Sequence, residues 1–290
     1  MAQQTVSRTA LGAVVCRLIE QYQPESNRLF VDPVAKEMVG GTIRLMMGLK
    51  FMRNFTAQQT DAVAPGIYGA QICRTRCIDD VVVAALAQGI QQVVILGAGY
   101  DTRPYRLAGI EKAKVFEVDL ATVQNDKKAK LRKLFGRLPE NVTFIPIDFD
   151  RQTLESVFTG SAFDFSKPAV FVWEGVTQYI TEGAVRQTLE FVQKSAPGSV
   201  IVFTYVLKSI IEGTSNIPGA AHIMETVAKS SPWIFGLDPK TVADFLKPYG
   251  LDVVADVGNA DYQTRYLKPL GRCLVVTEAE RIVQATRSGS

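Results

Sequence analysis

The feature that most constrains this chain is a regular alternation of short apolar segments with helical ones. Strands buried on both faces are apolar throughout and do not alternate with polar residues, and five segments here have that character. They lie at residues 92–96 (QVVIL), 114–118 (KVFEV), 142–147 (VTFIPI), 169–173 (AVFVW) and 199–205 (SVIVFTY). A helix is predicted before the first of them, at residues 68–88, and further helices between them at 122–134 and 182–194. The alternation predicts a doubly wound α/β fold with a mostly parallel sheet covered by helices on both faces.

The last third of the chain is expected to complete a seven-stranded sheet. A helix at residues 239–246 precedes a strand at 253–257, and residues 272–277 (RCLVVT) have the composition of a final strand. Because little helix is expected between these two strands, they predict a terminal hairpin with an antiparallel edge. Residues 287–290 are expected to be a loose tail.

The first third of the chain has no strand pattern and is expected to form a helical cap. A helix is expected at residues 10–22, and Asp32–Pro33 marks a chain break. The basic amphipathic stretch at 38–55 is interpreted either as a helix packed on the core or as a mobile lid over an apolar substrate. We expect one domain over residues 1–290, with the cap at 1–67, the Rossmann-like core at 68–285 and a lid insert at 206–236.

Composition narrows the classes of function. Lys plus Arg number 32 and Asp plus Glu 29, so the net charge of +3 demands neither nucleic acid nor an anionic membrane. No apolar run is long enough to span a bilayer, and the N-terminus lacks a secretory signal pattern, so a cytoplasmic protein is expected. Cys73 and Cys77 share a helix face, but the sole histidine, His222, is distant, and no metal site is expected.

In sheets of this kind, ligands bind at the carboxyl ends of the strands. Gly97 and Gly99 follow the first strand and allow a tight turn with close backbone approach to a ligand. The third glycine of the dinucleotide fingerprint would fall at Thr102 and is absent. The turn therefore suits a ligand whose amino-acid part crosses it better than a pyrophosphate. A turn that binds nothing is the alternative.

Carboxylates follow the next two strands. Asp119 can accept hydrogen bonds from both hydroxyls of a ribose, although a helix cap would also explain it. Asp148 and Phe149 follow the third strand, where they could accept from an adenine amino group and frame the base. A capped loop start is the alternative for this pair.

Two further charged residues are candidates for binding an amino-acid ligand. Glu174 follows the fourth strand beside a glycine, where it could bind an ammonium group or a sugar hydroxyl. A solvated acid in a loop is the alternative for Glu174. Arg74 could hold a ligand carboxylate through its forked donors. An ion pair with Asp79 or Asp80 is an equally weighted interpretation of Arg74.

These motifs together resemble the leucine carboxyl methyltransferase family. They are RTRCIDD (residues 74–80), LGAGYDTR (96–103), FEVD (116–119) and WEGVTQY (173–179). The family includes protein-phosphatase methyltransferases and many bacterial and polyketide-tailoring O-methyltransferases. The resemblance runs from about Ser7 to Thr277, and the second and fourth motifs are specific in combination.

The resemblance implies S-adenosylmethionine as cofactor on a class I methyltransferase fold. Arg74 would hold its carboxylate, Glu174 would lie near its ammonium, and Asp119 would bind its ribose. The other implied contacts belong to the glycine loop, the adenine edge and the N-terminus: Arg17, Gly97, Gly99, Asp101, Asp148 and Phe149. The family varies greatly in its substrate lid, so the resemblance does not name the acceptor.

The acceptor is predicted from the supply of bases. A carboxylate is already ionised at neutral pH and needs no general base, whereas a phenol or alcohol does. The residues that could serve as base or orient an acceptor are few: Tyr179, Tyr205 and His222. This favours a carboxylate over a phenol or enol hydroxyl as acceptor. The apolar residues with few cations at 38–55 and 207–235 predict a roof that suits a small organic acid with an apolar body.

Three alternatives stay open. One is a protein C-terminal carboxyl methyltransferase, and another is a binding protein that kept the fold without the activity. The third is an NAD(P)-dependent oxidoreductase, which the missing third glycine and the lack of a Tyr-x-x-x-Lys pair near the fifth strand argue against.

Overall fold

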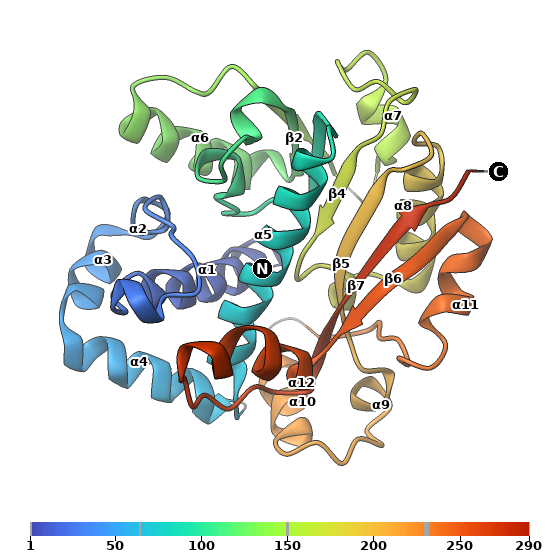
Figure 1. Ribbon diagram of the computed structural model, residues 1–290. Coiled ribbons are helices and arrows are strands. Elements are labelled where there is room, and N and C mark those ends of the chain that lie inside the picture. The colour runs from blue at the N-terminus through green and yellow to red at the C-terminus, as the bar shows by residue number, and fades with distance from the viewer. Residues whose placement is uncertain (1, 64, 149–150, 229–231, 290) are drawn as a thin grey trace.

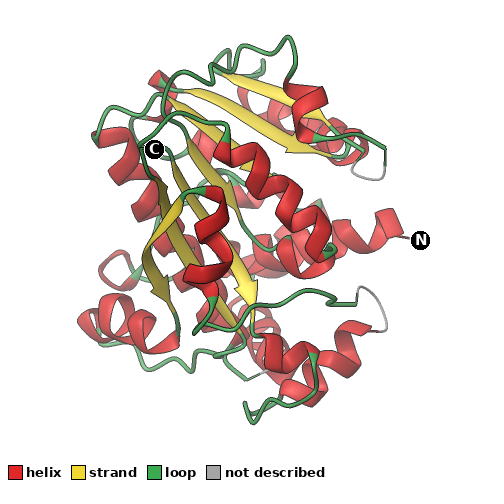
Figure 2. Cartoon of the chain, turned by 90° about the vertical axis from the view of Figure 1, so that its right-hand side faces the viewer, coloured by secondary structure: helices red, strands yellow, loops and turns green. Residues whose placement is uncertain are grey.

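A seven-stranded sheet runs through the middle of the molecule with helices on both sides (Figures 1 and 2). The computed structural model describes residues 2–63, 65–148, 151–228 and 232–289. The strand order is β3-β2-β1-β4-β5-β7-β6. The strands are β1 (Gln92–Leu96), β2 (Lys114–Asp119), β3 (Val142–Pro146), β4 (Val170–Trp173), β5 (Val200–Val206), β6 (Leu251–Val257) and β7 (Glu280–Arg287). The predicted doubly wound α/β fold is confirmed.

The first five strands are parallel, and β7 pairs antiparallel with both β5 and β6. The expected antiparallel pair is therefore present at this end of the sheet. Its geometry differs from a simple hairpin, because a helical segment separates the two strands and β6, not the last strand, forms the edge.

The predicted final strand at residues 272–277 is wrong, and the last strand is instead β7. Residues 272–277 lie against the start of α5 (Ile67–Ala87). There Thr277 N donates to Gly66 O at 3.1 Å, and a Cβ on Gly69 would clash with Val275 O. The close contact with α5 keeps this apolar stretch out of the sheet. The expected tail also begins later, because β7 extends to Arg287.

Helices cover the two faces of the sheet with two separate apolar clusters. One face is covered by α1, α2, α5 and α6, and the other by α7, α8 and α11. The helices are α1 (Ala2–Glu20), α2 (Ala35–Met38), α3 (Gly41–Gly48), α4 (Lys50–Val63), α5, α6 (Ala121–Phe135), α7 (Leu154–Phe158), α8 (Glu182–Gln193), α9 (Lys208–Ile211), α10 (Ala220–Ala228), α11 (Val242–Leu246) and α12 (Asn259–Tyr262).

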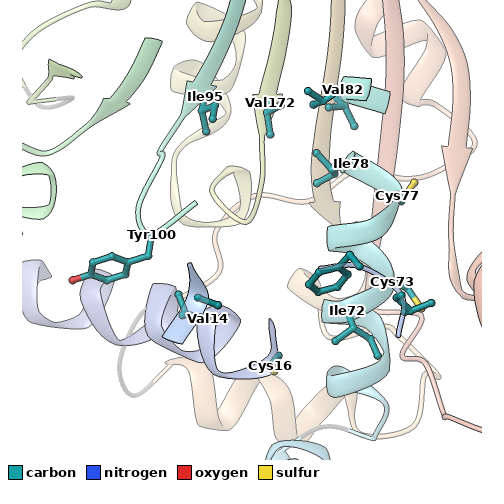
Figure 3. Packing of buried hydrophobic residues seen from close by; sticks show 14 of the residues in the cluster. Val14, Cys16, Ile72, Cys73, Cys77, Ile78, Val82, Ile95, Tyr100 and Val172 are labelled. Carbon is teal, nitrogen blue, oxygen red and sulfur yellow. The ribbon is translucent and has the colours of Figure 1, made fainter. Parts of the chain in front are cut away.

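The long helix α5 is the main support of the first face. Its Ile78 and Val82 lie beside Ile95 of β1 and Val172 of β4, while Val14 of α1 lies near Tyr100 (Figure 3). All of these side chains are buried. The packing holds α1 against the loop that follows β1.

The first third of the chain is helical, as expected. The stretch at 38–55 is divided between α3 and α4, with Leu49 in extended backbone between them. The insert after β5 forms α9 and α10, which pack with Ala279 in a small cluster of their own. Among the helices within the described ranges, none is long and apolar enough to cross a membrane.

Candidate functional site

The glycine turn lies where the strand order reverses. From β1 the chain proceeds outward to β2 and β3, whereas β4 and β5 lie on the other side of β1. Gly97 and Gly99 both have positive φ, at +63° and +42°, a conformation that side chains disfavour. A Cβ on Gly97 would lie 2.5 Å from Val176 Cγ2, so the loop after β1 packs directly on the loop after β4. This junction is where open α/β sheets bind their ligands.

A pocket opens at this junction, between the two helices of the first face and the two loops. Its walls come from α1, α5, the end of β1 with its glycine loop, and the residue that follows β4. The lining residues are Ala13, Val14, Arg17, Arg74, Ile95, Leu96, Gly97, Ala98, Gly99, Tyr100, Asp101 and Glu174. The structure thus brings together six of the residues predicted for the cofactor: Arg17, Arg74, Gly97, Gly99, Asp101 and Glu174.

Ion pairs join the charged residues of the pocket. Arg74 Nε donates to Glu174 Oε1 at 2.7 Å, and Arg74 Nη1 donates to both carboxylate oxygens of Glu280, at 2.7 and 3.0 Å. Arg103 Nη1 donates to Glu174 Oε2 at 2.7 Å and to Asp101 Oδ2 at 2.5 Å. Glu174 is therefore held between two arginines. The alternative pairing of Arg74 with Asp79 or Asp80 is not what these contacts show.

The network continues beneath the pocket. Asp79 accepts from Arg103 Nε at 2.8 Å and from two nitrogens of Arg106, at 2.7 and 2.8 Å. Asp32 Oδ2 lies 3.6 Å from Arg106 Nε and 3.3 Å from Arg17 Nε. The set contains one more acid than base: Asp32, Asp79, Asp101, Glu174 and Glu280 against Arg17, Arg74, Arg103 and Arg106. Without a ligand, the cluster has one unbalanced negative charge.

The arginines keep two of these carboxylates, Glu174 and Asp101, ionised. Burial alone would raise the pKa of Glu174, but Arg103 and Arg74 outweigh it and hold that pKa far below its usual range. Burial and Arg103 oppose each other at Asp101 in the same way, and its pKa is also lowered. The pocket therefore offers carboxylates that remain charged at neutral pH.

Asp119 ends β2 beside the pocket without lining it. Its Oδ2 accepts from Gly99 N at 2.5 Å and its Oδ1 accepts from Leu120 N at 2.6 Å. Burial raises the pKa of Asp119, against the lowering effect of these two backbone donors. The side chain thus holds the glycine loop against the first turn of α6, and each of its oxygens keeps a second lone pair.

The predicted adenine contacts are not part of the described pocket lining. Asp148 follows β3 and its half-exposed side chain lies 3.7 Å from Arg151 Nε. Phe149 lies outside the described residues.

The three candidate catalytic residues are also outside the pocket lining. Tyr179 is half-buried at the end of a short helical turn, η4 (Thr177–Tyr179). Tyr205 lies in the other apolar cluster and donates to Asp256 Oδ2 at 2.8 Å; burial and that acid raise its pKa, which makes it a poor base. His222 is exposed on α10.

The sequence did not indicate the polar roles of four residues of this region. Arg103 stands in the LGAGYDTR motif, yet its role as the centre of the ion network depends on partners distant in sequence. No local sequence pattern indicates Glu280, because 206 positions separate it from its partner Arg74. Gln178 Oε1 and Trp233 Nε1 are buried and have no hydrogen-bond partner within the described part of the chain. Their segments are joined by Ile234 N, which donates to Gln178 O at 2.8 Å.

Comparison with solved structures shows the fold. A protein from Thermobifida fusca YX described as a "putative methyltransferase" is 16% identical, with a TM-score of 0.60 over 88% of this chain and 94% of its own. A DUF574 family protein from Streptomyces avermitilis is 14% identical, with a TM-score of 0.58 over 93% and 99% of the two chains.

Sequence comparison gives closer relatives. One from Mycolicibacterium paratuberculosis, named "Putative S-adenosyl-L-methionine-dependent methyltransferase", is 31% identical over 68% of this chain and 64% of its own length. Another with that designation, from Streptomyces coelicolor, is 30% identical over 74% and 75% of the two chains. The match thus spans slightly less than two thirds of the first relative.

The model of the leucine carboxyl methyltransferase family matches residues 10–193. This range contains the glycine turn, the carboxylate after β2 and the WEGVTQY segment after β4. Because the match covers more than half of the chain, the protein belongs to the leucine carboxyl methyltransferase family.

Proposed function

We propose that this protein transfers a methyl group from S-adenosylmethionine to a carboxylate on a small organic molecule. The observation that carries the cofactor assignment is the single unbalanced negative charge of the buried network at the pocket. S-adenosylmethionine has a sulfonium, an ammonium and a carboxylate, so it bears one net positive charge. A ligand of that charge balances the network, whereas a dinucleotide with its anionic pyrophosphate would add to the imbalance.

The pocket residues fit the amino-acid end of this cofactor. Arg74 Nη2 makes none of the hydrogen bonds found in the described ranges and is available to a carboxylate. Glu174 and Asp101 are ionised and can accept from the ammonium. Gly97 permits the close backbone approach that the methionine chain requires.

Asp119 fits the ribose. Its two oxygens already accept one backbone N–H each, and the remaining lone pairs suffice for two hydroxyl groups. The same backbone hydrogen bonds fix the carboxylate in place, so little side-chain entropy is lost on binding.

The acceptor assignment depends on the absence of a suitable base near the pocket within the described residues. When bound, the cofactor supplies an electrophilic methyl group on sulfur, and the protein must align an acceptor oxygen with it and exclude water. None of the three candidates lines the pocket: Tyr205 is engaged with Asp256, His222 is exposed on α10, and Tyr179 lies on η4. A carboxylate needs no such base.

The acceptor would lie beside η4. Trp233 Nε1 is a buried donor without a partner in the described ranges, and it can donate to an acceptor carboxylate. The lid insert around it supplies an apolar wall from Ile217, Ile223 and Met224. These neighbours suit an acid with an apolar body more than an extended peptide.

Two measurements test the proposal. Calorimetry is expected to show binding of S-adenosylmethionine or S-adenosylhomocysteine and not of NAD; the reverse would refute the cofactor assignment. Mass spectrometry should then detect methyl transfer to small carboxylic acids. Transfer only to phenols, or only to a peptide with a free C-terminal leucine, would refute the acceptor class while leaving the cofactor assignment intact.

A matched variant tests the absence of a base. We expect His222→Ala to change turnover by less than about tenfold, because no general-base contribution of about 10²–10⁴ is removed. Turnover of a carboxylic acid and of any phenol that reacts should be compared. A loss above a hundredfold, with cofactor binding unchanged, would instead assign His222 as the base of a hydroxyl methyltransferase.

A further inference from the structure

Five large apolar side chains of α3, α4 and the link between them are exposed to solvent. They are Leu45, Met46, Leu49, Phe51 and Phe55, and we call this set the α3–α4 face. Leu45 is 75% exposed and Phe51 is 66% exposed. Single exposed apolar residues are common on proteins, but five within eleven positions form a patch of the kind that marks a binding surface.

The helices present these residues on the outside of the molecule. Phe51 and Phe55 are four residues apart in α4, so they project from one side of that helix. Leu45 and Met46 lie on α3, where Met47 is the only buried side chain, and Leu49 lies in the extended link between the two helices. Figure 1 shows α3 and α4 at the outer margin of the molecule, away from the sheet. Core packing therefore does not explain the set.

The charge around the face is mostly positive. Residues 38–60 contain Arg44, Lys50 and Arg53 and no acid, and Lys36 is exposed on α2. The nearest acids along the chain are Glu37, which pairs with Arg44 at 2.8 Å, and Asp61, which accepts from Tyr68 N. Arg53 donates to Met47 O and Gly48 O, which fixes its charge at the junction of the two helices. Lys36, Lys50 and Arg53 form no salt bridge within the described ranges, so positive charge predominates beside the apolar residues.

We propose that the α3–α4 face docks this protein on an anionic lipid surface. Exposed Phe, Leu and Met side chains flanked by Lys and Arg match what an interfacial helix presents to the boundary between headgroups and acyl chains. Each uncompensated cation is attracted to an anionic leaflet. Because no helix in the described part of the chain can span a bilayer, the attachment is peripheral.

The same charge pattern argues against a second copy as the occupant. In a two-fold symmetric dimer the patch would meet itself, and the unpaired Lys36 and Lys50 would meet like charges. No acid within residues 38–60 is available to compensate them. Attraction to an anionic surface removes that repulsion.

Vesicle sedimentation tests the proposal. The full chain is mixed with phosphatidylcholine vesicles, with and without about 30 mol% phosphatidylglycerol. We expect binding to the anionic vesicles only, weakened at about 0.5 M NaCl because salt screens the charges. The double variant Phe51→Ser/Phe55→Ser should bind the anionic vesicles about tenfold less, and Lys50→Glu should also weaken binding.

Matched controls lie elsewhere on the surface. Val254 and Val275 are 59% and 66% exposed outside the face, and Val254→Ser and Val275→Ser should bind vesicles like the unaltered protein. Equal S-adenosylmethionine affinity in all variants shows that they are folded. The proposal is overturned if the unaltered protein does not sediment with anionic vesicles, or if the double variant sediments equally well. The face would instead be assigned to self-association if the unaltered protein forms a dimer and binds no vesicles, and if the double variant is monomeric.

Discussion

The pocket between β1 and β4 and the α3–α4 face depart from the usual distribution of side chains in opposite directions. In the pocket, charged groups are buried, and the side chain of Arg103 is only 1% exposed. On the α3–α4 face, apolar groups are exposed, with Leu45 at 75%. Burying charge and exposing apolar surface both oppose folding, so neither arrangement is explained by stability alone. In the pocket, ion pairing offsets the free-energy cost of burying charge. On the α3–α4 face, no contact within the described chain offsets the cost of exposing apolar side chains.

The largest expected effect is on the pocket network. Arg103→Met removes the common partner of Asp79, Asp101 and Glu174 and should lower the free energy of unfolding by about 3–5 kcal/mol, because buried acids lose their counter-charge. Urea denaturation measures it. The surface variant Arg137→Met, which loses only an exposed pair with Glu140, should leave the midpoint unchanged. Equal midpoints for the two variants would show that the buried network does not stabilise the fold.

The next effect concerns the cofactor more than the fold. Asp119→Ala should weaken S-adenosylmethionine binding by about 2–3 kcal/mol, through loss of the proposed ribose contacts to a charged group. Calorimetry on the folded variant measures the change. Asp119→Asn keeps one acceptor oxygen, so its affinity for S-adenosylmethionine should lie between those of the unaltered protein and of Asp119→Ala. Undiminished affinity in Asp119→Ala would contradict the ribose contact. Asp119 would then serve only to accept the backbone hydrogen bonds from Gly99 N and Leu120 N.

Glu280 tests how the pocket positions its arginine. It holds Arg74 Nη1 with both oxygens without lining the pocket, so we expect Glu280→Gln to weaken S-adenosylmethionine binding by about 1 kcal/mol. Binding of methylthioadenosine, which lacks the amino-acid end, should not change, because Arg74 is proposed to hold only the carboxylate. A general loss of structure would weaken both ligands equally. Glu278→Gln, an exposed neighbour bonded to Asn259, is the control.

The smallest effect is expected on the exposed face. Phe51→Ser should change the free energy of unfolding by no more than about 0.5 kcal/mol, because an exposed ring contributes little packing. Urea denaturation again measures it. A destabilisation above about 2 kcal/mol would mean that Phe51 is packed in solution, which would remove the contrast between the two regions.

The parallel half of the sheet could be predicted closely from the sequence. The strand expected at 92–96 is Gln92–Leu96, and that expected at 142–147 is Val142–Pro146. Strands buried on both faces must be apolar throughout, so burial leaves a direct trace in the composition. The glycine turn was predictable for a related reason, because its backbone conformation requires a specific residue type at Gly97.

The antiparallel end and the ion network were not predictable in this way. RCLVVT has stronger strand composition than ERIVQATR, yet the second segment is β7. Its polar residues are accommodated by distant partners: Glu280 pairs with Arg74, and Arg281 pairs with Asp256 at 2.9 Å. Pairings of this kind depend on the assembled sheet, which local propensity does not describe.

The place of β7 in the sheet has a consequence for the order in which the molecule is assembled. β5 and β6 both pair with β7 and not with each other, although β7 is the last of the three to leave the ribosome. Until then, the edge of β5 stays open and Arg74 has no Glu280 to hold it. At the proposed site, the cofactor would therefore bind a nascent chain at full strength only after the strand that closes the sheet has been synthesised.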